Sequence, residues 1–190
     1  EPMIERDPTT GDLEPKLATS WERTSDTEWT IRLRDDVTFS DGTPFDAEDA
    51  AVSVDRAVNS DLACNVEGYV FGDDDLTVRA VDPTTLTVAS PTPDPILPLR
   101  LSFIEMVKSE VGKTERTREP IGTGPYRVAA FRPDVSLLLE AHDAYWGGRP
   151  PLRSIRFLEV PELAARVAGL RAGDFGMACD IPPDAIAEIE

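Results

Sequence analysis

The sequence contains few of the residues on which catalysis and metal binding most often depend. Its 190 residues include one histidine, His142, and two cysteines, Cys64 and Cys179, without CxxC spacing. Motifs typical of serine hydrolases, zinc proteases and nucleotide-binding loops are also absent. These absences argue against nucleophilic, metal-dependent and nucleotide chemistry. The sequence therefore predicts no enzyme activity, no cofactor and no metal site.

Positive charge and long apolar runs are scarce as well. There are 19 Lys and Arg against 36 Asp and Glu, which gives a net charge of −17. Such a field repels phosphate backbones, so nucleic acid is not expected as a partner. No run approaches the roughly 18 apolar residues that span a bilayer, and no signal peptide is visible. Because the chain begins with Glu1 and not Met, we expect a mature or excised segment.

The overall composition is that of a globular protein with many loops. Hydrophobic residues make up 41% of the chain, and 17 prolines favour a mixed fold over a helical bundle. The length allows one large domain or two smaller lobes. Cys64 and Cys179 could form one long-range disulfide in an exported protein or could remain free thiols, and the sequence leaves both open.

Alternating apolar and polar residues predict several strands. Trp29, Ile31 and Leu33 share one face of a half-buried strand over residues 28–34. A hairpin is predicted where two short alternating runs flank a turn at Asp82 and Pro83. Further strands are predicted over 126–131, 135–140, 155–160 and 176–179.

Three helices are predicted. Asp46 is a typical N-cap residue, and the helix behind it is expected over residues 47–58. The first-turn carboxylates Glu48 and Asp49 are better explained by the helix dipole than by a catalytic pair. Further helices are predicted over 161–171, ended by Gly173, and from Pro183 onward. The fold class is mixed α and β (α+β or α/β), with a hint of parallel βαβ connections.

Two aromatic and Gly-rich segments, with the polar residues near them, are interpreted as structural. Residues 120–126 (PIGTGPY) fix a backbone path into the next strand. Tyr145 and Trp146 are expected to pack against a sheet, and His142 is expected in a solvent-facing turn. Residues 73–75, three aspartates, are read as a solvated hairpin turn and not as a calcium loop, because EF-hand spacing is absent.

Together, seven landmarks along the chain resemble one family, the peptide/nickel class of ABC-transporter solute-binding proteins (family 5), which includes oligopeptide- and dipeptide-binding proteins. The landmarks are 17–22 (LATSWE), 29–34 (WTIRLR), 37–45 (VTFSDGTPF), 47–49 (AED), 122–126 (GTGPY), 145–148 (YWGG) and 170–174 (LRAGD). Phe175 and Gly176 depart from the family pattern.

The resemblance implies a type II periplasmic-binding-protein-like fold of which this chain is the N-terminal lobe only. On the layout of the family, residues 1–23 and 118–190 resemble part of the hinge-bearing lobe. Residues 24–117 resemble the inserted side domain, and the opposite lobe is absent.

The resemblance also implies a function. It is that of a monomeric extracytoplasmic receptor, lipid-anchored in its full-length form, that captures a peptide or similar small solute by hinged closure and delivers it to a membrane permease. A ligand-sensing regulatory domain of the same fold is the alternative, and a carboxylate-based hydrolase is a third reading. Neighbouring sequence would separate the first two, because a lipoprotein signal favours transport.

Ligand contact is expected at two regions that the family places near the cleft. One is the segment 65–71, with Asn65 and Tyr69, and the other is residues 103–105, with Phe103 and Glu105. If Glu105 faces the cleft, its carboxylate could accept a charge-assisted hydrogen bond from a ligand amine. Core packing is the competing role for Phe103.

Overall fold

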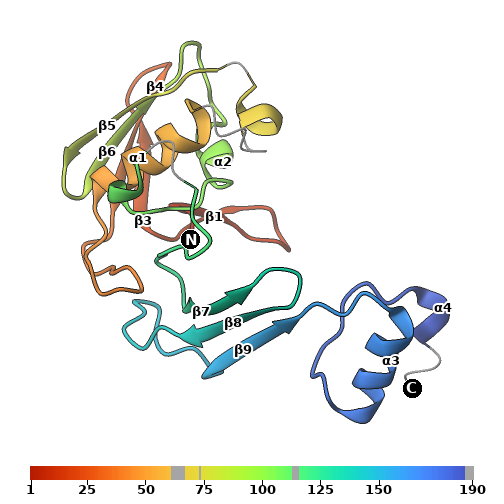
Figure 1. Cartoon of the computed structure of the whole chain (residues 1–190). Coiled ribbons are helices and arrows are strands. Elements are labelled where there is room, and N and C mark those ends of the chain that lie inside the picture. The colour runs from red at the N-terminus through yellow and green to blue at the C-terminus, as the bar shows by residue number, and fades with distance from the viewer. Residues whose placement is uncertain (61–66, 73, 113–115, 187–190) are drawn as a thin grey trace.

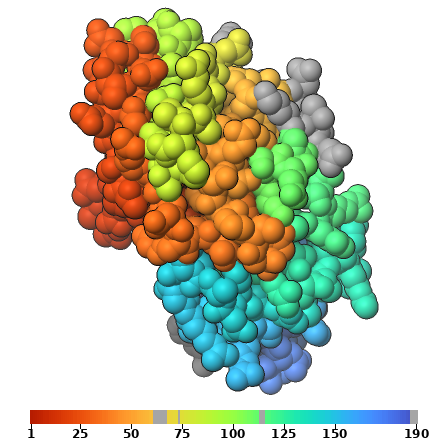
Figure 2. All heavy atoms as spheres, turned by 90° about the vertical axis from the view of Figure 1, so that its left-hand side faces the viewer, coloured from red at the N-terminus to blue at the C-terminus, as the bar shows by residue number. Residues whose placement is uncertain are grey.

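The structure is a computed structural model that describes residues 1–60, 67–72, 74–112 and 116–186. Figure 1 shows two parts. The first part, residues 1–112, holds a four-stranded sheet with helices α1 and α2. The second part, from residue 116 onward, holds a three-stranded sheet with helices α3 and α4. In Figure 2 the cyan and blue second part lies below the first part.

The four-stranded sheet forms the frame of the first part. Its strands are β3 (Ala18–Arg23), β4 (Glu28–Leu33), β5 (Thr77–Asp82) and β6 (Thr85–Ala89), in the spatial order β3-β4-β6-β5. Every adjacent pair is antiparallel. The predicted strand at 28–34 and the predicted hairpin at Asp82 are therefore confirmed.

Helix α1 (Ala47–Val58) lies against β5 and β6 and begins where its capping residue predicts. The Asp46 carboxylate accepts from the backbone N–H groups of Glu48 and Asp49, at 2.9 and 3.2 Å. In return, the Asp49 carboxylate accepts from the Asp46 N–H at 3.1 Å, which completes a capping box. Asp49 is buried and also accepts from the Ser109 N–H at 2.7 Å, so its role is structural.

Shorter elements close the first part around one hydrophobic core. They are the ribbon of β1 (Ile4–Arg6) and β2 (Leu13–Pro15), a π-helix (Glu67–Phe71), α2 (Leu97–Leu101) and a 3₁₀ turn (Ser109–Val111). The largest fully buried side chains come from the four-stranded sheet, from α1 and α2 and from the segments between elements, and they include Phe39, Met3, Ile31, Leu86, Leu97 and Ile104. The main core cluster has all its buried members between Met3 and Met106.

The second part has a thinner core. Its sheet is made of β7 (Tyr126–Arg132), β8 (Ser136–Ala141) and β9 (Ser154–Leu158), again antiparallel, and none of these strand residues is buried. Helix α3 (Leu163–Ala172) ends at Gly173, whose φ of 78° lies in the left-handed region that favours glycine. Helix α4 (Pro183–Ile186) follows, as predicted.

Two sequence predictions about secondary structure are wrong. Residues 176–179 form no strand, and Met177 is 81% exposed. An isolated run of four residues gains no ladder hydrogen bonds without a neighbouring strand, and no described strand pairs with it. The hint of parallel βαβ connections also fails, because the sheets among the described residues are antiparallel.

The domain division stays a prediction. The β3–β4 hairpin crosses the proposed boundary between residues 23 and 24, since Trp21 pairs with Ile31. Residues 18–23 therefore share a sheet with residues 28–33, which the resemblance places in the side domain. The boundary near residue 118 falls where the chain passes from the first part to the second (Figure 1).

Candidate ligand-binding surface

Three of the four predicted ligand-contact residues lie on segments that meet at helix α2. Tyr69 is in the π-helix and is 91% exposed, and Phe103 follows α2 and is 51% exposed. Phe103 thus faces solvent and does not fill the core. Glu105 pairs with Pro2 in an isolated β-bridge and its side chain is 70% exposed. Asn65 lies outside the described residues.

Arg100 on α2 joins these segments. Its Nε donates to the carbonyl oxygen of Val70 at 3.0 Å, and its Nη2 donates to that of Phe71 at 3.2 Å. Nη2 also donates to Asp74 at 2.9 Å, and Nη1 forms a close ion pair with Asp94. The guanidinium lies over the Phe71 ring, 4.4 Å from its centroid.

The contacts of Arg100 also bear on residues 73–75, for which the sequence predicts a solvated hairpin turn. Asp74 is bound to Arg100 and so is not simply solvated, while Asp73 lies outside the described residues. Among the described residues, no group of three or more His, Cys, Asp or Glu side chains is placed to hold a metal ion.

Glu105 Oε2 lies 2.8 Å from the amino group of Glu1. The Glu1 carboxylate accepts from two aromatic donors of the second part, the Tyr145 hydroxyl and Trp146 Nε1, the latter at 3.0 Å. Burial of the hydroxyl is the larger cause, and its hydrogen bond to the Glu1 carboxylate the second, of the raised pKa of Tyr145. Trp146 packs against the core cluster, which agrees with the expected packing role of this residue, whereas Tyr145 is held by its hydrogen bond to Glu1.

The Gly-Pro segment 122–125 passes between the two parts. Ser40 N–H donates to the Gly122 carbonyl at 2.9 Å, and Thr123 is fully buried. The prediction for His142 is wrong, because this residue is only 6% exposed. The backbone N–H of His142 donates to the Pro125 carbonyl at 2.8 Å, and the ring Nδ1 lies 3.3 Å from the Gly124 carbonyl. The Gly-Pro segment therefore covers this histidine.

An ion pair supports the loop beside this junction. Lys108 Nζ lies 2.8 Å from Asp41 Oδ2, and Thr43 donates to Oδ1 of the same carboxylate from its N–H and its hydroxyl. The Lys108 and Thr43 hydrogen bonds hold the pKa of Asp41 well below its ordinary value, and the same pair raises the pKa of Lys108.

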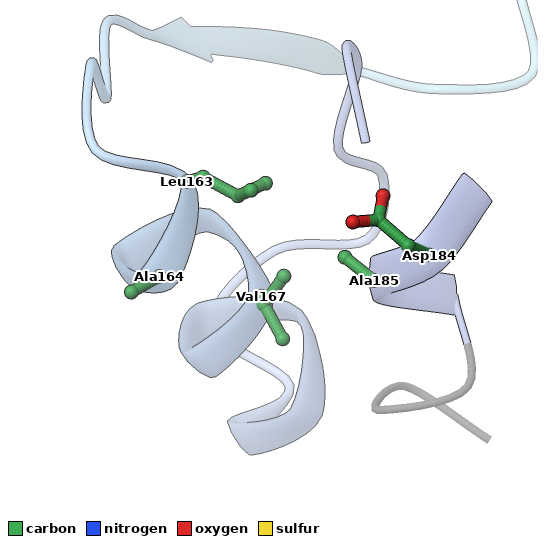
Figure 3. Close-up of a pocket in the computed structure, with 5 residues that line it drawn as sticks. All are labelled: Leu163, Ala164, Val167, Asp184 and Ala185. Atoms are coloured by element: carbon green, nitrogen blue, oxygen red, sulfur yellow. The ribbon is translucent and has the colours of Figure 1, made fainter. Parts of the chain in front are cut away.

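A hollow of about 250 Å³ lies elsewhere, between α3 and α4. Figure 3 shows Leu163 and Val167 of α3 across from Asp184 and Ala185 of α4. Its lining is mostly aliphatic with one carboxylate, and none of the predicted contact residues borders it. We assign the hollow no binding role.

A family model that describes the bacterial extracellular solute-binding proteins, family 5 Middle, matches residues 12–190. The chain belongs to this family. The match covers every landmark that the sequence supplied, from residues 17–22 to residues 170–174.

Individual relatives agree with the family 5 assignment. The nickel-binding periplasmic protein of Escherichia coli strain K12 is 30% identical over 175 residues, which cover 88% of this chain and 33% of that protein. The periplasmic oligopeptide-binding protein of Haemophilus influenzae is 28% identical over 208 residues, which cover 95% of this chain and 38% of that protein. The family 5 chain described here thus spans only about a third of these relatives.

Solved structures show the same fold over most of the chain. The crystal structure of a nickel ABC transporter protein from Bacillus halodurans matches with a TM-score of 0.83 and 29% identity, covering 98% of this chain and 38% of that one. An ABC transporter substrate-binding protein from Sinorhizobium meliloti matches with a TM-score of 0.76 and 28% identity, covering 92% and 36%. The fold is therefore that of part of a type II periplasmic binding protein.

The cysteine prediction is untested by this structure. Cys179 is exposed and bonded to no described cysteine, and Cys64 lies outside the described residues. A mass change of two daltons on reduction would show the pairing. Within the described ranges, no helix has both the length and the apolar character to cross a bilayer.

Sequence reasoning missed two members of the site, Arg100 and Glu1. Most partners of each residue lie far away in the chain, such as Val70 for Arg100 and Trp146 for Glu1, so no local pattern marks either residue. The one available signal was the unusual position of an arginine inside the apolar run 96–103, where a charge needs partners.

Proposed function

We propose that this chain is the N-terminal-lobe portion of an extracytoplasmic solute-binding component of an ABC importer. The complete polypeptide captures a peptide or a similar small solute by hinged closure and delivers it to a membrane permease. We further propose that it works as a monomer outside the cytoplasm, held at the membrane by a lipid anchor. Family 5 membership over residues 12–190 is the observation that carries this proposal.

The surface chemistry supports binding without turnover. Tyr69 and Phe103 offer exposed aromatic rings, and the side chain of Glu105 is 70% exposed although one of its carboxylate oxygens pairs with the Glu1 amino group. Aromatic rings and a few polar groups are what a solute site requires. The buried ionisable groups described above are held in structural contacts, as Asp49 is by backbone N–H groups.

The proposal predicts that the solute is gripped between this lobe and a second one. Closure then adds contacts that neither lobe makes alone, and solute favours the closed state through those contacts. The present 190 residues should bind solute weakly, because half of the binding surface lies outside them.

The test compares the longer polypeptide that contains these residues with the 190-residue chain. Native mass spectrometry of the purified longer polypeptide identifies any solute that remains bound. Calorimetry then measures binding of three probes: trialanine, glutathione and the nickel(II)–histidine complex. We expect the longer polypeptide to bind one probe with a dissociation constant of about 1 μM or lower. Lack of binding to all three, with no co-purified solute, would contradict the proposal.

Two comparisons sharpen this experiment. Binding at about 1 μM by the 190-residue chain alone would contradict the two-lobe mechanism. Glu105→Gln in the longer polypeptide should weaken a probe that carries a free amine, and Glu22→Gln, an exposed carboxylate on β3, is the matched control. Unchanged affinity in the Glu105 variant would remove that residue from the site.

A further inference from the structure

Arg100 has more partners than charge neutralisation requires. Asp94 is only 8% exposed at its side chain and needs a cation, but one ammonium group would satisfy that need. Beyond its ion pairs with Asp94 and Asp74, Arg100 donates hydrogen bonds to the carbonyls of Val70 and Phe71, the last residues of the π-helix. Only a planar guanidinium can donate in several fixed directions at once.

The segment that Arg100 holds carries an exposed aromatic ring. Val70 and Phe71 directly follow Tyr69, and Phe71 is buried under the guanidinium while Tyr69 points to solvent. At the other end, the backbone carbonyl of Arg100 accepts from the Phe103 N–H at 3.3 Å. The guanidinium of Arg100 thus joins the backbone next to Tyr69 to α2, the helix that directly precedes Phe103.

We propose that Arg100 is a positioning residue that fixes Tyr69 relative to Phe103, and through them sets the affinity for solute. The inference rests on the proposed function. Its side chain is 13% exposed, so it acts through the backbone that it holds and not by contact with solute. Lysine at this position would keep the charge for Asp94 but could not donate to both carbonyls and both carboxylates.

The first test needs no solute and uses the 190-residue chain. The sequence contains three tyrosines, Tyr69, Tyr126 and Tyr145, so selective ¹⁵N-tyrosine labelling gives three backbone amide signals. In the unmodified chain we expect an order parameter near 0.85 for Tyr69; Arg100→Lys should lower it to below about 0.6. Tyr126 and Tyr145 serve as internal references. Arg23→Lys, an exposed arginine on β3, is the control variant.

The second test measures trialanine binding by the longer polypeptide in a double-mutant cycle. Arg100→Lys should weaken binding about five- to tenfold. If Arg100 acts through Tyr69, adding Arg100→Lys to Tyr69→Ala should cause no further loss. Additive losses in the cycle would indicate a general structural role and overturn the inference.

The outcomes separate this inference from the proposed function. An unchanged Tyr69 order parameter in Arg100→Lys overturns the inference whatever the longer polypeptide binds, and so does a lowered order parameter with unchanged trialanine affinity. If the unmodified polypeptide binds none of the three probes and carries no co-purified solute, the proposed function fails, and the relaxation comparison alone decides whether Arg100 positions Tyr69.

Discussion

The guanidinium of Arg34 lies over the indole ring of Trp146, with its Cζ atom 4.3 Å from the ring centroid. Arg34 directly follows β4 in the first part, and Trp146 belongs to the second. The indole N–H donates to the carboxylate of Glu1. Arg34 thus contacts the face of the ring, and Glu1 binds its edge. Trp146 is therefore a principal contact between the two parts.

Trp146→Ala should destabilise the fold by about 2–4 kcal/mol, because it removes core contact, a hydrogen bond and a cation–π contact together. Urea unfolding followed by circular dichroism measures the change. Trp146→Phe keeps a ring for Arg34 but loses the indole donor, and should cost about 1 kcal/mol. Equal losses in the two variants would show that the hydrogen bond, and not the packing, dominates this contact.

Asp46→Ala should lower the free energy of unfolding by about 1 kcal/mol, because two first-turn N–H groups of α1 lose their acceptor. Asp46→Ser retains an N-cap oxygen and should recover most of the loss. Glu22→Gln, an exposed change on β3 that leaves the first turn of α1 unaltered, is the control. Urea unfolding gives the midpoints of the parent, the two Asp46 variants and the control. Equal midpoints for Asp46→Ala and the parent would refute the capping role.

The Asp41–Lys108 pair should make stability depend on pH in a defined direction. The pKa of Asp41 is lower in the fold than the ordinary 3.8, so its contribution is present above that pH and is lost as the pH falls toward the lowered value. Lys108 has a raised pKa, so its contribution is present below 10.5 and is lost as the pH rises through the raised value.

Asp41→Asn tests this directly. Urea midpoints should be lower than those of the parent chain near pH 7, and the difference should shrink as the pH falls below the ordinary pKa of the carboxylate. Glu22→Gln, which removes one exposed carboxylate on β3, controls for net charge. A difference between Asp41→Asn and the parent that is the same at pH 7 and pH 2 would argue against the pair.

The elements that the sequence predicted correctly are those with a local cause. Asp46 caps α1 through atoms two and three residues away, and the β5–β6 hairpin follows from alternation on both sides of Asp82. The burial of His142 depends instead on the carbonyls of Gly124 and Pro125, which the pairing of Tyr126 with Ala141 brings beside it. A pattern within one segment does not contain that information.

The residues of the candidate site likewise fall into those that the sequence predicted and one that it did not. Tyr69, Phe103 and Glu105 were located by chain order within a family pattern, and all three prove to be exposed. Arg100 was missed because its partners come from three segments that meet only in the fold. Chain order therefore located three exposed side chains, but not the arginine that binds the backbone next to Tyr69.

The sheet of the second part should bind apolar dyes on one face. The register places six apolar side chains on that face, none of them buried: Val128, Phe131, Leu137, Leu139, Ile155 and Phe157. Phe157 is 55% exposed. Phe157→Ser should therefore lower Nile red fluorescence and leave the free energy of unfolding within about 0.5 kcal/mol of the parent value. Arg156→Ser changes the opposite face and should leave the dye signal unchanged. If Arg156→Ser removed the signal and Phe157→Ser did not, the dye would be bound to the other face of the sheet.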